Sequence, residues 1–244
     1  METNSSEHSA VESSLEYLFQ WRYALLQSIK KLNKGLNFTV SIETLDDISY
    51  EGEEGYLEVS QIKHHIKKCK NLTNASTELW RTLNIWFKLV KSGIDSDVTF
   101  LLITTAIAPE MSAAYYLKPG DERNIPKSIE LLEKTAKNSK NEKNLEAYKL
   151  FKTFSASEKL DLFDNILVLD ESINIYDIEE KIQSQVRLNV NEKHLDSYIE
   201  HIEGWWFVRV TSHLQKKDHG KILSEEIRAE IDDLREQFKR DNLP

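Results

Sequence analysis

Apolar and polar residues alternate in three short stretches of the chain, over 38–43, 48–51 and 57–63. A period of two residues is typical of strands that bury one face. Gly52 and Gly55 separate the second stretch from the third, and glycine tolerates the positive φ of a hairpin loop. The pattern therefore predicts three strands, of which the last two form a hairpin.

A helical period of three to four residues surrounds these strands. It runs over 11–33 before them and over 76–91 after them, and a glycine follows each segment, as it often follows helices. The run 98–106 is almost continuously apolar, which is typical of a strand covered on both faces. We expect this strand to lie beside the first one and parallel to it, after a crossover helix. The expected fold class is therefore α/β, with an α-β-β-β-α-β core.

The pattern changes after Pro109. From there a helical period continues almost to the end of the chain, interrupted by one candidate strand over 166–169. We therefore predict three segments. A polar lead-in over 1–14 is disordered, a mixed core spans 15–109, and an all-helical accessory region spans 110–244.

Composition places the chain among globular proteins that do not cross a membrane. Charged residues make up 30% of its 244 residues, and no apolar run approaches the roughly 20 residues of a membrane span. The first 14 residues lack the basic and then apolar order of a signal peptide. Cys69 is the only cysteine, which fits a reducing compartment. The expected location is cytoplasmic, without contact to a membrane.

The predicted hairpin brings polar side chains of two strands together. If its turn is centred near Glu54, Asp47 lies across from Gln61, with Lys63 on the same face and Glu43 across the preceding turn. Carboxylate and amide oxygens can hold a hard divalent cation, while an ammonium group orients water and stabilises phosphate charge. This arrangement predicts a metal-dependent phosphodiesterase site. Its Mg²⁺ or Mn²⁺ would be bound by Asp47, Gln61 and Glu43, and Lys63 would complete the catalytic set.

Two features leave this site open to other interpretations. Asp46 is a rival to Asp47 as the ligand, although strand parity favours Asp47 because it shares a face with Ser49. The amide of Gln61 is also a weaker metal ligand than a carboxylate. The alternative to an enzyme is therefore a catalytically inactive nuclease-like scaffold that binds DNA or a partner protein.

The distribution of charge bears on a nucleic-acid partner. The formal net charge of −9 is unfavourable for DNA binding, which depends on neutralising phosphates. Local basic surface is offered by Lys30, Lys31 and Lys34 and by the connector 63–70. A solvated run of charges is the alternative interpretation. The residues expected to bind DNA in the connector are His65, Lys67, Lys68 and Lys70.

Four segments carry a resemblance to a known family. YLFQWRYAL (17–25), IETLDDI (42–48), SQIKHH (60–65) and TELWRTLNIW (77–86) resemble the double-stranded DNA endonuclease domain of CBASS-type and related antiphage effectors. The Gln-x-Lys pair resembles the Mrr-like branch of the PD-(D/E)xK restriction-endonuclease-like superfamily. The resemblance implies a restriction-endonuclease-like core and cleavage of double-stranded DNA with low sequence specificity. It also implies a homo-oligomer or a defence-system partner protein, and a polar side chain lent to the site by the first helix, for which Gln20 is the best match.

Overall fold

The computed structural model of the protein describes residues 3–45, 47–63, 71–94, 97–172, 177–215 and 220–239, with side chains from Ser14 onward. The chain divides into two compact units. Unit 1 combines Met1–Gly55 with Ile173–Pro244, and unit 2 is the continuous segment Tyr56–Ser172. The two ends of the sequence therefore belong to the same unit.

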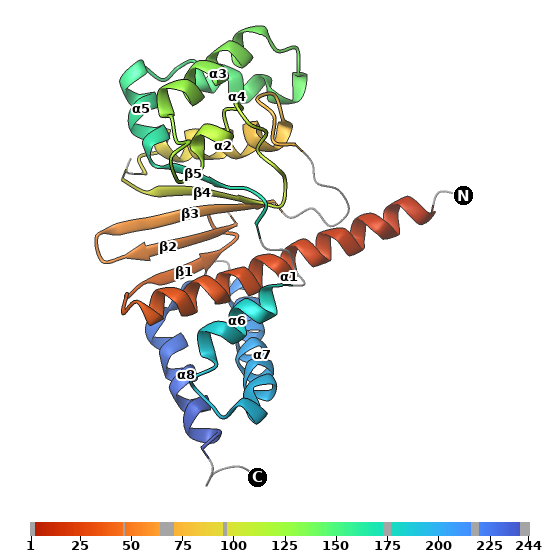
Figure 1. Ribbon diagram of the computed structural model, residues 1–244, viewed down its shortest axis with the longest axis vertical. Coiled ribbons are helices and arrows are strands. Elements are labelled where there is room, and N and C mark those ends of the chain that lie inside the picture. The colour runs from red at the N-terminus through yellow and green to blue at the C-terminus, as the bar shows by residue number, and fades with distance from the viewer. Residues whose placement is uncertain are drawn as a thin grey trace. The chain divides into compact units, whose positions relative to one another are not determined.

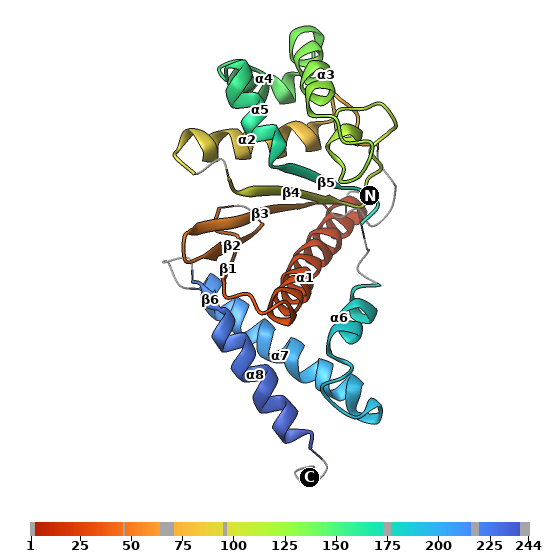
Figure 2. The same cartoon turned by 60° about the vertical axis from the view of Figure 1, so that its left-hand side comes forward.

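Unit 1 contains a small antiparallel sheet with β1 in its middle. Val40 of β1 lies opposite Tyr50 of β2 on one side and opposite Ile222 of β6 on the other. The hydroxyl of Tyr50 donates a hydrogen bond of 3.0 Å to the carbonyl of Ala24, which ties β2 to α1. Helix α1 lies along β1 in both views (Figures 1 and 2). The elements of unit 1 are α1 (Thr3–Asn33), β1 (Thr39–Ile42), β2 (Ile48–Gly52), α6 (Ile178–Val186), η3 (Glu192–His194), α7 (Leu195–Leu214), β6 (Ile222–Leu223) and α8 (Ser224–Gln237).

Unit 2 contains three parallel strands, with β4 between β3 and β5. Helix α2 connects β3 to β4, and a helical crossover is the usual connection between parallel neighbours. Helices α2 to α5 lie together next to β4 and β5 (Figure 1). The elements are β3 (Gly55–Lys63), α2 (Thr77–Lys91), β4 (Thr99–Thr104), η1 (Tyr115–Leu117), α3 (Ile125–Asn138), η2 (Glu142–Asn144), α4 (Leu145–Phe151), α5 (Ala156–Asp164) and β5 (Ile166–Leu169).

Tryptophans anchor the cores of both units. Trp80 and Trp86 of α2 are fully buried, and Trp206 of α7 has an exposed fraction of only 2%. The ring of Trp80 stands edge-on to that of Tyr148 with centroids 4.5 Å apart, a favourable geometry for aromatic pairs. Phe207, next to Trp206 in the sequence, is 49% exposed and does not belong to this core.

The structure confirms the α/β class but changes the predicted order of strands. We expected the strand over 98–106 to lie beside the first strand. Strand β4 instead pairs with β3 and β5, while β1 pairs with β2 and β6 within unit 1. A crossover helix usually places the next parallel strand beside the strand that it follows. Helix α2 follows β3, so β4 lies beside β3. The specific restriction-endonuclease core is not confirmed.

Two further differences concern elements with weak local patterns. Helix α1 begins at Thr3, so residues 3–14, which we expected to be a disordered lead-in, are helical. Strand β6 precedes α8 in a region predicted to be helical, whereas the candidate strand over 166–169 is confirmed as β5. The division into segments 15–109 and 110–244 stays a prediction. The packing of the chain divides it after Gly55 and after Ser172.

No helix in the described ranges is long and apolar enough to span a membrane.

Candidate functional site

Two of the predicted site residues close the β1–β2 hairpin of unit 1. The backbone N–H of Glu43 donates to the carbonyl of Asp47 at 3.1 Å, one step beyond the Ile42–Ile48 pair of the ladder. Glu43 takes a φ of 58°, which is uncommon for a residue other than glycine. Glu43 is exposed, whereas Asp47 is buried and has an exposed fraction of 8%. The backbones of these two residues therefore meet across the turn, while the arrangement of their carboxylates as one site stays a prediction.

The other two catalytic candidates lie at the end of β3 in unit 2. Gln61 is 2% exposed and pairs with Leu102 of β4 in the parallel ladder. Lys63 is half-buried and pairs with Thr104. The carbonyl of Lys63 accepts a hydrogen bond of 3.2 Å from the N–H of Thr105. Both residues approach the carboxyl ends of parallel strands, which is where α/β folds commonly bind ligands.

Four buried amide oxygens in the described part of the chain lack hydrogen-bond partners, those of Asn84, Asn144, Gln20 and Gln61. Two of them belong to predicted site residues, Oε1 of Gln20 on α1 and Oε1 of Gln61 on β3, and both of these side chains are more than nine-tenths buried. A buried polar atom without a partner costs about 1–3 kcal/mol, so native proteins keep few of them. Both residues were selected from the sequence. Their free oxygens suit a donor or a cation as ligand.

The full predicted site joins residues of both units. Glu43, Asp47 and Gln20 belong to unit 1, and Gln61 and Lys63 belong to unit 2. Their convergence on one ion, the Mg²⁺ or Mn²⁺ itself, and hydrolytic activity all stay predictions. Within the described residues, no three His, Cys, Asp or Glu side chains gather closely enough to hold a metal ion. A metal there would depend on amide oxygens as well as carboxylates.

Other predicted residues fall outside the described ranges. These are Asp46, the rival of Asp47, and the basic connector residues His65, Lys67, Lys68 and Lys70.

Replacing Gln61 with methionine is expected to raise the free energy of unfolding by about 1 kcal/mol. Methionine has a similar volume and removes the unsatisfied oxygen, and functional residues often reduce stability in this way. Urea denaturation of the two proteins measures the difference. The matched control is Gln61→Glu, which keeps the shape but buries a charge and should lower stability. A methionine variant less stable than the wild type would show that the oxygen is already satisfied.

The polar groups at the carboxyl edge of unit 2 are largely paired. Thr104 donates to Oε1 of Glu78 at 2.9 Å. The almost fully buried carboxylate of Asp170 accepts from the N–H of Ala108 at 2.9 Å and lies 2.6 Å from Nζ of Lys118. That hydrogen bond raises the pKa of Lys118 above its ordinary value. These contacts fix the loop after β4, and they neutralise the ammonium of Lys118 and the carboxylate of Asp170.

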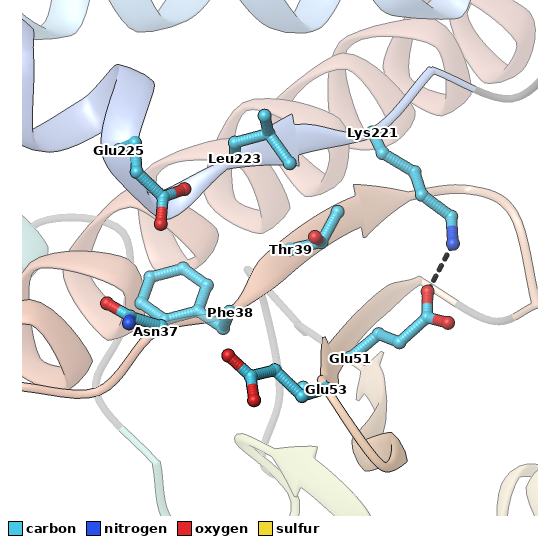
Figure 3. Close-up of a pocket in the computed structure, with 9 residues that line it drawn as sticks. Asn37, Phe38, Thr39, Glu51, Glu53, Lys221, Leu223 and Glu225 are labelled. Atoms are coloured by element: carbon cyan, nitrogen blue, oxygen red, sulfur yellow. Dashed lines mark hydrogen bonds and ion pairs between the residues drawn. The ribbon is translucent and has the colours of Figure 1, made fainter.

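Two pockets that the sequence did not reveal are both acidic. The pocket of unit 1 has a volume of about 330 Å³ and lies where β1 begins and where β2 and β6 end (Figure 3). Glu51, Glu53 and Glu225 line it, and its one lysine, Lys221, forms an ion pair with Glu51. The pocket of unit 2, of about 430 Å³, is lined by Asp97, Ile125, Leu160, Asp161, Asp164 and Asn165. Carboxylates in this number repel anions, so neither pocket suits a phosphate ligand.

Solved structures of known proteins resemble the chain over nearly its whole length. The Cap4 SAVED/CARF-domain containing receptor of Moraxella osloensis matches 92% of it with a TM-score of 0.54 and 16% identity. The Acinetobacter baumannii Cap4 SAVED/CARF-domain containing receptor matches 90% with a TM-score of 0.52 and 13% identity. The same receptor with the cyclic trinucleotide 2'3'3'-cAAA matches 90% with a TM-score of 0.51 and 14% identity. At these identities the likeness shows the fold alone.

The chain spans about half the length of these receptors, covering 49%, 47% and 46% of them respectively. No protein-family model matches the sequence, and no curated protein sequence is detectably similar to it.

The comparisons overturn two predictions. The three neighbours are receptors named for a SAVED/CARF domain, and none of the three is named as a restriction-endonuclease-like nuclease. We therefore correct the assignment to the PD-(D/E)xK superfamily and the function inferred with it, metal-dependent cleavage of double-stranded DNA in antiphage defence. The physical reason is the brevity of the motif. A strand with alternating positions places two polar residues such as Gln61 and Lys63 on one face without any chemistry attached.

Proposed function

We propose that the protein forms part of a receptor that senses a cyclic oligonucleotide in antiphage defence. The observation that carries the proposal is the likeness over 90–92% of the chain to Cap4 receptors, one of them bound to a cyclic trinucleotide. The defence context agrees with the one expected from the sequence. The chain spans about half of each neighbour, so the proposal concerns one part of such a receptor.

The charge of the ligand limits where this chain can contact it. A cyclic trinucleotide carries three phosphodiester groups, each with one negative charge, and binding them requires positive charge nearby. The acidic pockets of both units do not provide it. The contact must therefore involve a basic surface outside these pockets.

Titration calorimetry of the purified protein with 2'3'3'-cAAA tests the proposal. We expect binding whose affinity falls as the salt concentration rises, because phosphate contacts release counterions. Thermal unfolding with and without the ligand gives an independent reading, since a ligand that prefers the folded state stabilises it. Adenosine monophosphate is the control and should bind more weakly because it cannot make several phosphodiester contacts. Absence of binding and of any thermal shift would refute a sensing role for this chain.

The other expected partners follow from the same proposal. A defence-system partner protein or a second copy of the chain remains part of the proposal, because a receptor in a defence system must pass its signal to another molecule. Double-stranded DNA as a partner stays a prediction, and its proposed contacts fall on connector residues that the structure does not describe.

A further inference from the structure

Helices α1 and α6 of unit 1 pack against each other (Figure 1), and polar contacts join them at two points. Nη2 of Arg22 lies 3.5 Å from Oε2 of Glu179 near the start of α6. Nδ2 of Asn33, at the end of α1, donates to the carbonyl and to Oε1 of Gln185 at 3.3 and 3.4 Å. The two helices therefore run side by side in the same general direction. We call the surface along this contact the α1–α6 seam.

Three lysines gather along the seam. Lys30 belongs to the last turn of α1, Lys34 follows directly after the helix, and Lys181 belongs to α6 between its two contact points. Lys30 is half-buried, and the other two are exposed. Burial, together with the ammonium groups of Lys181 and Lys34, lowers the pKa of Lys30. The neighbouring Lys31 takes a different direction, with Nζ 4.5 Å above the ring of Tyr50.

The three lysines form no ion pair of their own. Among the described residues, no carboxylate forms an ion pair with Lys30, Lys34 or Lys181. At the start of the seam Arg22 is paired with Glu179 and Glu203, and elsewhere in the unit Arg209 and Lys221 are each paired with a glutamate. Like charges placed side by side destabilise a helix pair, and an anion bound between them removes the repulsion.

We propose that Lys30, Lys34 and Lys181 form a binding site for phosphodiester groups. Lysine binds phosphate as a point charge on a flexible stem, so three of them on two elements can follow successive phosphates. A cyclic trinucleotide and a linear nucleic-acid strand share this chemistry. If the ligand is a cyclic trinucleotide, the seam is the basic surface that the proposed sensing function requires. For that ligand, the inference rests on the proposed function.

The test compares two variants with the same change of net charge. The seam variant carries Lys30→Glu and Lys181→Glu, and the control carries Lys134→Glu and Lys149→Glu on exposed faces of α3 and α4 in unit 2. Each protein is titrated at low salt with 2'3'3'-cAAA in one arm and with a short DNA duplex in the other. Whichever of the two ligands the wild type binds, we expect the seam variant to bind it at least about tenfold more weakly. Phosphate contacts dominate the affinity of proteins for nucleic acids and nucleotides. The control should stay within about twofold of the wild type.

Loss of folding would not explain the expected result. The seam variant replaces a repulsive set of lysines with two glutamates beside Lys34, so its melting temperature should be equal to or above that of the wild type. Weakened binding of the cyclic trinucleotide alone assigns the seam to the sensing function, and weakened binding of the duplex alone assigns it to nucleic acid. If the wild type binds a ligand and both variants bind it equally well, the seam is not the site, although the proposed function stands. If the wild type binds neither ligand, both proposals fail.

Discussion

Replacing Trp206 with alanine is expected to lower the free energy of unfolding of unit 1 by about 3–5 kcal/mol. Trp206 is 2% exposed and lies on the buried face of α7 together with Ile202 and Val210. Its Nε1 donates a hydrogen bond of 2.8 Å to the carbonyl of Trp21, which connects α7 to α1. The substitution leaves a cavity of indole size and removes this bond, so both losses act on the same helix contact.

Urea denaturation followed by circular dichroism measures the effect. The control is Phe207→Ala at the next position, where the side chain is 49% exposed and the expected loss is below about 1 kcal/mol. Because the chain has two units, the curve can show two transitions, and only the one that belongs to unit 1 should shift. Equal losses from Trp206→Ala and Phe207→Ala would contradict the burial of one side of α7.

Arg123→Ala is expected to destabilise unit 2 by about 3 kcal/mol. The guanidinium group donates to four backbone carbonyls: Asp164 at 2.6 Å, Ile166 at 3.0 Å, Leu117 at 3.1 Å and Phe163 at 3.4 Å. Two of them belong to the last turn of α5, where a cation also opposes the negative end of the helix dipole. Alanine would leave these acceptors without their charged donor.

Arg123→Lys separates hydrogen bonding from charge. Lysine keeps the positive charge but lacks the planar fork, so we expect it to restore less than half of the lost stability. Arg81→Ala on the exposed side of α2 is the control for removing an arginine and should change stability little. A lysine variant as stable as the wild type would show that the charge alone stabilises the end of α5.

Much of the secondary structure could be predicted because it depends on local signals. A capping box is a four-residue signal, and the one formed by Ser155 and Glu158 opens α5 with both of its hydrogen bonds present. Strands β1 to β3 and helix α2 begin and end within a few residues of their predicted bounds. In each case the period of the apolar residues and the flanking cap or glycine lie within one short window of sequence.

Long-range relations were harder to predict. Strand β6 has only two residues, and nothing around Ile222 indicates that it pairs with Val40, far away in the sequence. The candidate site shows the same limit. Gln61 was identified from its position on a strand, but its missing hydrogen-bond partner depends on everything packed around it. The lysine cluster of the α1–α6 seam also escaped prediction in part, because Lys181 is remote from the basic run at Lys30.

The discontinuous make-up of unit 1 has a consequence for biosynthesis. A ribosome completes Tyr56–Ser172 as one uninterrupted stretch, so unit 2 has all its strands and helices available before the last third of the chain has been made. β1 must instead wait for Ile222 before its second edge is covered. During that interval the nascent chain exposes an unpaired strand edge, which is the kind of surface that chaperones protect and that leads to aggregation. The folding yield of this protein in cells should therefore depend on the speed of translation after residue 172.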